Sequence, residues 1–196
     1  MRVLLALLLL ALPAMAMAQS DPSTFPLTPI CDTRVDDDGD CITDAVGDTV
    51  CVEGIVLAWK EYGSRGPGAI YDPVSGCALS IFDISSQPDI PAGTLVRVCG
   101  WVGYFAGLAE IIDEPGNGSN DPVVTIIDPG PFPEAPVQVS AADLADYSPL
   151  AEELESRLVQ LCGQFVDSGD FLPFSSNNDF VDVDGNTVTV RIDSDT

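Results

Sequence analysis

Short runs of alternating apolar and polar residues fill the middle of the chain, and they restrict the fold more than any other feature. Such alternation, bounded by Gly, Pro or Asp, is typical of half-buried β-strands because successive strand side chains point to opposite faces of a sheet. Several short strands with turn residues between them predict a small all-β barrel or sandwich, not a parallel sheet covered by helices. The runs read TVCVEGIVLAW, GAIYD, CALSIFDI, TLVRVCGWVGYF and LAEIID.

Residues 1–18 have the pattern of a secretory signal peptide. Arg2 precedes an apolar run from Val3 to Leu12, and small residues follow up to Ala18. We therefore expect cleavage before Gln19 and a protein that is secreted or periplasmic. The apolar run is too short to cross a bilayer, and no run of about 18 apolar residues follows it. We expect no membrane contact after cleavage.

The chain is strongly acidic, which bears on its partners. Acidic residues outnumber basic ones by 31 to 7, and the formal net charge is −24 at pH 7. Removal of Arg2 with the signal peptide takes this charge to −25. Such a surface repels the phosphates of nucleic acids and of anionic lipids. Apolar residues make up 46% of the chain, so it can build a core and is not a disordered acidic tail.

The sequence contains no His. This excludes Ser-His-Asp and Cys-His catalysis and metal sites with imidazole ligands. A hydrolase would have to use carboxylate pairs, such as Glu152 with Glu153 or those from Asp36 to Asp40. Catalytic carboxylates must face each other across a cleft, whereas these are neighbours in the sequence. We predict that the protein is not an enzyme and has no catalytic residues, with a carboxylate hydrolase as the last alternative.

Composition divides the rest of the chain into four parts. Residues 19–45 are an acidic leader, and residues 46–113 hold the five alternating runs. A stretch rich in Pro and Gly predicts a linker over residues 114–139. Residues 140–196 combine one helical pattern with strand-like runs, which predicts a helix followed by further strands.

The helical pattern is SAADLADYSPLAEELESRL, and it is interrupted near Pro149. Ser140 can cap its first turn, since a serine side chain accepts hydrogen bonds from free N–H groups at a helix start. Leucines recur at four-residue spacing, which predicts a stripe that packs on a sheet. These leucines are Leu150, Leu154 and Leu158.

The end of the chain repeats part of the barrel segment. Placing Gly163 on Gly54 sets LVQLCGQFV against TVCVEGIVL, and the same offset places Gly185 on Gly76. Two glycines and two apolar runs in one ungapped register indicate an internal repeat. The second copy stops without a counterpart of TLVRVCGWVGYFAGLAEI, so we expect a partial second OB-like repeat or a piece of a longer protein.

The segments GDTVCVEGIVLAWKEYGSRGPGAIYDPVSGCALSIFD and IPAGTLVRVCGWVGYFAGLAEIID resemble the OB-fold domains of exported bacterial proteins. The shared features are V-x-V-x-G-x-V, G-A-I-Y-D, G-x-x-V-x-V-x-G and a final Gly107-Leu108-x-Glu110-Ile111. Similar domains accompany secreted nucleases, phosphoesterases and lamin-tail domains. The resemblance implies a five-stranded barrel over residues 46–113 and brings no active site. Glycines such as Gly54 and Gly100 suit strands that coil sharply.

OB-folds that bind single-stranded nucleic acid use a basic groove and stacking aromatic rings. This chain offers aromatic and basic side chains on its first hairpin and fourth strand, and they are the candidate ligand-binding residues. The competing interpretation is that the aromatic rings fill the ends of the barrel, which we favour. The candidates are Trp59, Lys60, Tyr62, Arg65, Tyr71, Trp101 and Tyr104.

The leader contains VDDDGDCITD, which resembles a calcium loop. In such loops oxygen ligands recur at every second position, with Gly at position 6 and a bidentate carboxylate at position 12. Here position 6 is Cys41 and position 12 is Gly47, so both features are missing. Related exported domains carry a similar acidic lead, and we interpret the segment as a tether, with calcium as the alternative cofactor. The candidate ligands are Asp36, Asp38, Asp40 and Asp44.

Six Cys in an exported chain can form disulfides, but spacing alone does not select among the pairings. Alternation places Cys51 and Cys99 on the same side of strands that are expected to pair, which predicts a Cys51–Cys99 disulfide. A second disulfide, between Cys31 and Cys41, could close the acidic leader.

The sequence therefore predicts an exported, non-catalytic OB-fold module with a binding or accessory role. Its partner is an unknown protein or small ligand, and its oligomeric state is left open. The first alternative is a nucleic-acid-binding module associated with an extracellular nuclease, which the fold permits and the charge opposes.

Overall fold

The structure is a computed structural model. Among the residues it describes, no helix is long and apolar enough to cross a membrane. The expected signal peptide, residues 1–18, lies outside the described part of the chain. The described residues are 21–60, 63–115, 121–145, 148–166 and 176–192.

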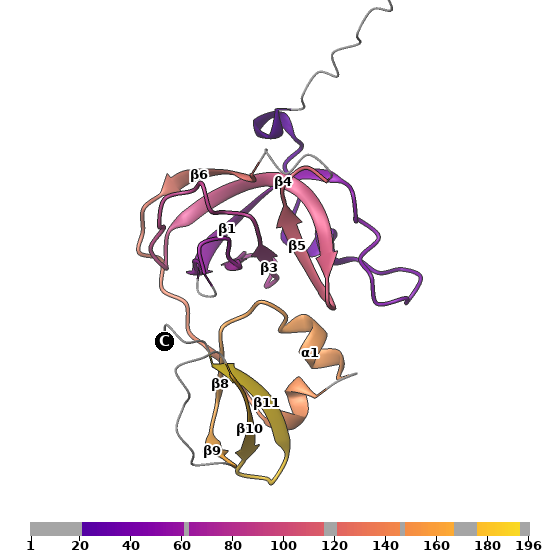
Figure 1. The fold of residues 1–196 in the computed structure, drawn as a ribbon, viewed down its shortest axis with the longest axis vertical. Helices are drawn as coiled ribbons and strands as arrows, with labels where there is room; N and C mark the ends of the chain where they lie inside the picture. The colour runs from indigo at the N-terminus through magenta and orange to yellow at the C-terminus, as the bar shows by residue number, and fades with distance from the viewer. Residues whose placement is uncertain (1–20, 61–62, 116–120, 146–147, 167–175, 193–196) are drawn as a thin grey trace, which may run out of the picture.

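Five strands form a barrel in the upper half of Figure 1. They are β1 (Thr49–Ala58), β2 (Gly68–Tyr71), β3 (Ala78–Ile81), β4 (Leu95–Phe105) and β5 (Leu108–Ile112). Their order is β1-β2-β3-β5-β4, and β4 pairs with β1 to close the barrel. The contact between β3 and β5 is parallel, and the other contacts are antiparallel. The predicted five-stranded OB-fold-like barrel is confirmed, because each alternating run supplies one strand.

The core of the barrel consists of the apolar side chains that alternation turns inward. Branched aliphatic residues from all five strands have no more than 1% of their surface exposed, and burial of such side chains is the main source of stability in a small domain. They include Val52 and Val56 from β1, Ile70 from β2, Leu79 and Ile81 from β3, Val96 and Val98 from β4, and Ile111 from β5.

Gly100 in β4 shows why glycine is needed where the barrel bends. A Cβ atom on Gly100 would lie 2.6 Å from Cγ2 of Ile111 and 2.8 Å from the carbonyl oxygen of Ile112. Both distances are shorter than van der Waals contact, so the two strands approach closely only because this residue has no side chain.

The leader and a sixth strand extend the barrel. The short 3-10 helices η1 (Pro22–Thr24) and η2 (Ile30–Arg34) precede β1. Between them, Leu27 forms an isolated parallel bridge with Cys51. Strand β6 (Val123–Asp128), which lies inside the segment predicted as a linker, pairs with β4.

Two disulfides fix the barrel. Cys51 and Cys99 occupy paired positions of β1 and β4 and are joined, as their alternation predicts. The second disulfide joins Cys31 to Cys77. The suggested Cys31–Cys41 pair is therefore wrong: η2 places Cys31 against the turn between β2 and β3, while Cys41 is an exposed free thiol. Two disulfides are compatible with an oxidising compartment.

The remaining elements form a second unit, in the lower half of Figure 1. They are β7 (Val137–Val139), η3 (Ala141–Leu144), α1 (Pro149–Glu153), β8 (Val159–Leu161), β9 (Gly163–Phe165), β10 (Ser176–Asp182) and β11 (Thr187–Ile192). Strands β9, β10 and β11 form one antiparallel sheet, and β7 pairs with β8 in parallel.

The helical segment is shorter than its sequence pattern indicates. Ser140 and Asp143 form a capping box, as the cap signal predicts, but η3 ends at Leu144 and α1 begins only at Pro149. The leucine stripe is not continuous, since Leu154 is buried and Leu158 is 44% exposed. Proline at the start of α1 supplies no N–H group to continue the preceding turn.

The second unit has the strand order of the first half of the barrel. The offset of 109 residues (163 minus 54) places β9 on residues 54–56 of β1 and β11 on residues 78–83, which begin with β3. In both copies an Asp closes the turn after the second strand: Asp72 accepts N–H groups of Val74 and Ser75, and Asp182 accepts those of Asp184 and Asn186. This shared strand order agrees with the partial second OB-like repeat that the sequence predicts. Strands β9, β10 and β11 correspond in order to β1, β2 and β3.

Candidate functional site

The outer face of β2, β3 and β5 is where the second unit meets the barrel. Ile70, Leu79 and Ile111 point into the core, so their strand neighbours Tyr71, Ser80 and Glu110 point outward. The covering residues, Leu154 to Arg157, follow directly after α1.

Each of three successive residues of this cover contacts a different strand. A carboxylate oxygen of Glu155 accepts the N–H of Ala109 in β5 at 3.1 Å. The hydroxyl of Ser156 lies 2.9 Å from that of Ser80 in β3. The guanidinium of Arg157 stacks 4.0 Å above the ring of Tyr71 in β2. The cover therefore crosses the face strand by strand.

An ion pair joins the cover to the leader at the seam between β3 and β5. Arg34 donates to the carbonyl of Ala78 in β3 and lies 2.8 Å from the carboxylate of Glu155. Glu155 in turn accepts the N–H of Ala109. The pairing of β3 with β5 begins only at Ser80 and Glu110. The ion pair therefore provides hydrogen-bond partners for the carbonyl of Ala78 and the N–H of Ala109, which lie before the first residue pair of these strands.

This ion pair is largely withdrawn from water. The side chains of Arg34 and Glu155 are 9% and 13% exposed. Burial raises the pKa of Glu155, and the Arg34 guanidinium opposes that rise.

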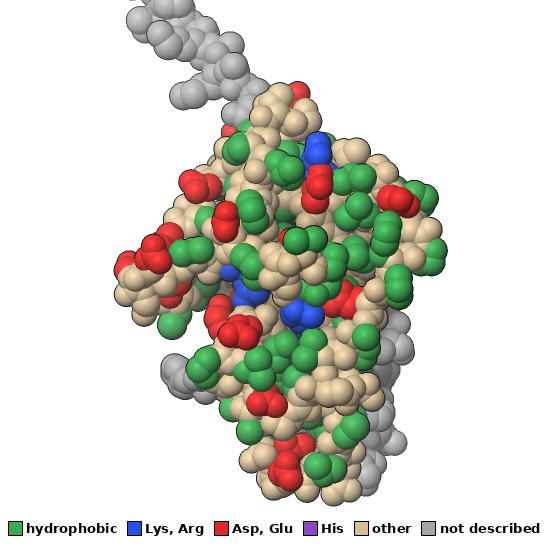
Figure 2. All heavy atoms as spheres, turned by 180° about the vertical axis from the view of Figure 1, so that it is seen from behind, with side chains coloured by type: hydrophobic (Ala, Val, Ile, Leu, Met, Phe, Trp, Pro, Cys, Tyr) green, Lys and Arg blue, Asp and Glu red, His purple; other side chains and the backbone are tan. Residues whose placement is uncertain are grey.

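A second ion pair lies beside the first. Arg157 is 3.4 Å from Glu134, with side-chain exposures of 13% and 8%. Burial raises the pKa of Glu134, although the Arg157 guanidinium lowers it in part. Figure 2 shows basic side chains at the level where the barrel meets the second unit, with acidic side chains close by.

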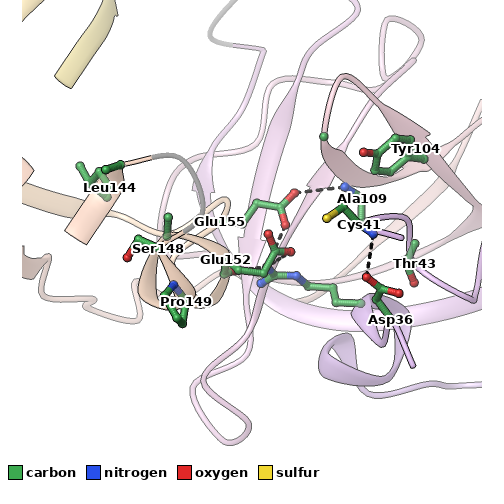
Figure 3. A pocket seen from close by; sticks show the side chains of 14 residues that line it. Asp36, Cys41, Thr43, Tyr104, Ala109, Leu144, Ser148, Pro149, Glu152 and Glu155 are labelled. Carbon is green, nitrogen blue, oxygen red and sulfur yellow. Dashed lines mark hydrogen bonds and ion pairs between the residues drawn. The ribbon is translucent and has the colours of Figure 1, made fainter. Parts of the chain in front are cut away.

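A cavity of about 630 Å³ opens next to the first ion pair. Three parts of the chain line it: the acidic loop of the leader, the turn between β4 and β5, and the η3–α1 segment. Figure 3 shows Glu155 between α1 and Ala109, with Tyr104 and Asp36 on the opposite wall. The lining is mixed in character and includes carboxylates, a guanidinium, a thiol and a phenol.

The predicted ligand residues near the first hairpin are held by internal contacts. Trp59 is 9% exposed and donates its ring N–H to the carbonyl of Pro88. Lys60 contacts the carbonyl of Gln87 and lies 3.4 Å from Asp89. Both side chains therefore tie the hairpin to the loop that follows β3.

The other predicted ligand residues are dispersed. Arg65 stacks on Phe82 at 5.0 Å and pairs with Asp83. Trp101 is 7% exposed and meets the ring of Phe25 edge to face at 5.0 Å. Tyr71 lies under Arg157, Tyr104 lines the cavity, and Tyr62 lies outside the described residues. Those that the structure describes are not brought together into one stacking platform.

The acidic loop brings three of the four predicted calcium ligands together. Carboxylate oxygens of Asp36, Asp38 and Asp40 all lie within 4.8 Å of one another. Asp44 is turned to the N–H of Asp37 at 3.0 Å and is not part of this group. Cys41, at position 6 of the loop, has a φ of 65°, in the left-handed region that glycine takes in calcium loops.

Hydrogen bonds inside the loop set its electrostatics. Desolvation is the largest single influence on Asp36 and raises its pKa, but hydrogen bonds from the N–H groups of Cys41, Gly39 and Asp40 together lower the pKa below its usual value. The N–H of Asp40 lowers the pKa of Asp38, yet the nearby carboxylates of Asp40 and Asp36 raise it on balance. The cluster thus gathers negative charge that a cation would offset.

The carboxylate pairs considered for hydrolysis do not face each other across a cleft. Glu152 and Glu153 are adjacent on the five-residue helix α1, and the side chain of Glu152 is 76% exposed and lies 3.6 Å from Arg34. Asp36 to Asp40 share one loop. Neither arrangement places one acid and one base on opposite sides of a bound substrate.

One titratable group at this face was not anticipated. Glu110 in β5 is only 7% exposed, and burial raises its pKa to about 7, with a further contribution from the Asp83 carboxylate. Its position in the strand alternates with core residues, which indicates a solvent-facing side chain. The burial comes from neighbouring segments, so the local pattern contains no signal of it.

The residues that build the junction were also missed by sequence reasoning. Arg34 and Glu155 are separated by 121 residues, and Ser80 and Ser156 by 76. Such pairs have no periodicity or spacing that a single sequence reveals. Only the direction of the chain after α1 brings them together.

Comparison with protein-family models gives no match, and comparisons with curated proteins and with solved structures give no significant match.

Proposed function

We propose that the protein is an exported, non-catalytic OB-fold module with a binding or accessory role. The observation that supports this most directly is the use of the outer barrel face: it holds the chain's own Glu155, Ser156 and Arg157 by contacts to β5, β3 and β2. A barrel face with these groups binds a polypeptide segment by hydrogen bonds, ion pairing and stacking. The partner class that fits this chemistry is another polypeptide of a larger surface assembly.

Export is the first part of the proposal to test. The signal-peptide pattern predicts a mature chain that begins at Gln19, and the two disulfides agree with an oxidising compartment. Intact mass of the protein recovered from periplasm or medium should equal that of residues 19–196. Recovery of a chain that keeps Met1 in the membrane fraction would contradict export.

The alternative function, nucleic acid binding, is opposed by charge. Single-strand binding needs cations along the groove that replace the counterions of phosphate. Lys60, Arg65 and Arg97 are the basic residues of the barrel segment, and each lies within ion-pair distance of a carboxylate. We predict a dissociation constant for oligo-dT weaker than about 100 μM at about 0.15 M salt.

Fluorescence anisotropy with labelled oligo-dT measures this directly. The control compares Trp59→Ala and Arg65→Ala with the unmodified chain. Micromolar binding that both substitutions weaken would replace the proposed role with nucleic acid binding.

Calcium binding is a second candidate property, favoured by the gathering of Asp36, Asp38 and Asp40 within 4.8 Å. Extracellular calcium modules bind with dissociation constants of about 0.1 to 1 mM, and we expect calcium binding by this loop, with its incomplete ligand set, to fall in that range. Titration calorimetry should detect binding heat that Asp38→Ala and Asp40→Ala remove.

Asp184→Ala is the matched control, since Asp184 is an exposed carboxylate outside the cluster. Equal heats from the unmodified chain and from all three variants would contradict a calcium site at the cluster and would indicate nonspecific screening of the acidic surface.

A further inference from the structure

The junction between the barrel and the second unit holds every unpartnered buried polar side-chain atom found in the described residues. These atoms are Nε of Arg34, Oε2 of Glu134 and Nε of Arg157. A buried polar atom without a hydrogen bond lowers stability, because it loses its hydrogen bonds to water on folding and forms none with the protein. All three belong to the two ion pairs that tie the second unit down.

The junction is also polar and loosely filled. Apart from the buried side chain of Leu154, its contacts are ion pairs, hydrogen bonds and one stacked guanidinium, and a cavity of about 630 Å³ lies beside them. The barrel, by contrast, has a closed apolar core. Polar interfaces between domains resemble transient ones, and they open before the core of either domain unfolds.

The connection between the two units is short and stiff. The segment between β6 and β7 reads PGPFPEAP. Its first half is held on the barrel, where the N–H of Phe132 donates to the carbonyl of Gly93. Prolines restrict the rest, from Pro133 to Pro136, to extended conformations. A short connection favours exchange of the units that it joins, because few residues are free to let the chain turn back on itself within one copy.

We propose that this junction is an exchange interface, at which Glu155, Ser156 and Arg157 of one copy occupy the β2–β3–β5 face of a second copy. The second copy is the occupant because its face carries the same partners: its Arg34 can pair with Glu155, and its Tyr71 can stack with Arg157. The contacts of Glu155, Ser156 and Arg157 with β5, β3 and β2 are re-formed between copies, so the exchanged dimer needs no new surface. Two copies repel each other at low salt, and raised ionic strength screens that repulsion.

Charge reversal tests the exchange. Arg34→Glu and Glu155→Arg each place like charges at the junction, and the double variant restores an ion pair within one chain. In an equal mixture of the two single variants, an exchanged heterodimer has one reversed pair and one original pair, so both junctions are complementary. Native mass spectrometry at high protein concentration should show the heterodimer at least tenfold above either homodimer.

The matched control is the pair Glu53 and Arg97, which joins β1 and β4 inside one barrel and cannot be exchanged with the second unit. A mixture of Glu53→Arg and Arg97→Glu should remain monomeric. A heterodimer in this control mixture would overturn the assignment of the interface.

A cross-link gives a second readout that does not depend on charge. The hydroxyl oxygens of Ser80 and Ser156 are 2.9 Å apart, so cysteines at both positions can pair. In a background of Cys41→Ser and Cys162→Ser, the double variant Ser80→Cys/Ser156→Cys should cross-link within one chain. A mixture of the single variants should give a disulfide dimer only through exchange. Monomers in both this mixture and the charge-reversal mixture would overturn the proposal.

Discussion

At the scale of single residues, Glu110 shows how the fold changes the chemistry of a side chain. The carboxyl group lies on the outer face of β5, opposite Ser80, and has no cation beside it among the groups that shift its pKa. Burial and the Asp83 carboxylate both favour the neutral acid. Glu155 lies on the same face but pairs with Arg34, whose guanidinium opposes the rise that burial causes in the pKa of Glu155.

This difference predicts how stability depends on pH. The pKa of Glu110 rises from 4.5 to about 7 on folding, so the folded state binds more protons than the unfolded state between these values. Its contribution is fully present below pH 4.5 and is lost as the pH rises through 7. The lost stability is about 3 kcal/mol.

Glu110→Gln removes this dependence because the amide is always neutral. Urea unfolding between pH 4 and pH 8 should show the variant about 3 kcal/mol more stable than the unmodified chain at the upper end, and nearly equal to it at the lower end. Glu153→Gln, at an exposed position of α1, should follow the unmodified chain throughout. A constant difference between Glu110→Gln and the unmodified chain across the range would contradict the assignment.

At the scale of elements, the pairing of β1 with β4 holds the barrel closed. Seven consecutive residue pairs join the two strands, from Thr49 with Trp101 to Ile55 with Leu95. The Cys51–Cys99 disulfide lies within this ladder, and its sulfur atoms are shielded by the surrounding chain. The Cys31–Cys77 disulfide instead ties η2 to a turn at the surface.

The two disulfides close loops of nearly the same length, with sequence separations of 48 and 46 residues. Loss of either disulfide should therefore lower the free energy of unfolding by about 4 kcal/mol, because the unfolded chain regains the entropy of an open loop. Cys51 and Cys99 are 2% and 3% exposed, so replacing both by Ala also leaves an unfilled space in the barrel. Cys51→Ala/Cys99→Ala should be the less stable double variant.

Urea unfolding without reductant compares this variant with Cys31→Ala/Cys77→Ala. The result that would contradict the argument is a larger loss from the Cys31–Cys77 pair.

At the scale of the whole molecule, an apolar barrel and a partial repeat meet at a charged junction. Leu154 is the buried apolar residue of the cover, and the remaining contacts come from Glu155, Ser156 and Arg157. The barrel should therefore stay folded when the junction opens. Protection of backbone amides should differ between the two units.

Arg157→Ala tests this separation. The substitution removes the stacking on Tyr71, the hydrogen bond to the carbonyl of Gly76 and the partner of Glu134. We expect it to weaken docking of the second unit by about 2 kcal/mol, since a buried acid loses its cation. Hydrogen exchange should accelerate in β7 to β11 and remain unchanged in β1 and β4.

Arg97→Ala is the control, because the side chain of Arg97 is 48% exposed and pairs with Glu53 on the barrel surface. Exposed pairs contribute at most about 1 kcal/mol. Equal exchange in the two variants would mean that Arg157 does not hold the second unit.

The amino-acid sequence determined what depends on neighbouring residues. Alternation defined the five barrel strands, and the side on which Cys51 and Cys99 lie followed from the same period of two. The capping box at Ser140 and the partial repeat were likewise readable, because caps and repeats are local patterns. The helix after Ser140 was overestimated, since η3 ends at Leu144 and α1 runs only from Pro149 to Glu153.

Only the tertiary structure decided which surface is covered and which groups are buried there. Arg34 reaches Glu155 across 121 residues, and Cys31 pairs with Cys77 instead of Cys41 because η2 lies against the turn between β2 and β3. Ion pairs and disulfides between distant segments depend on how the chain returns on itself, and no local period encodes that path. That the outer barrel face is covered by Glu155, Ser156 and Arg157 therefore depends on the path of the whole chain.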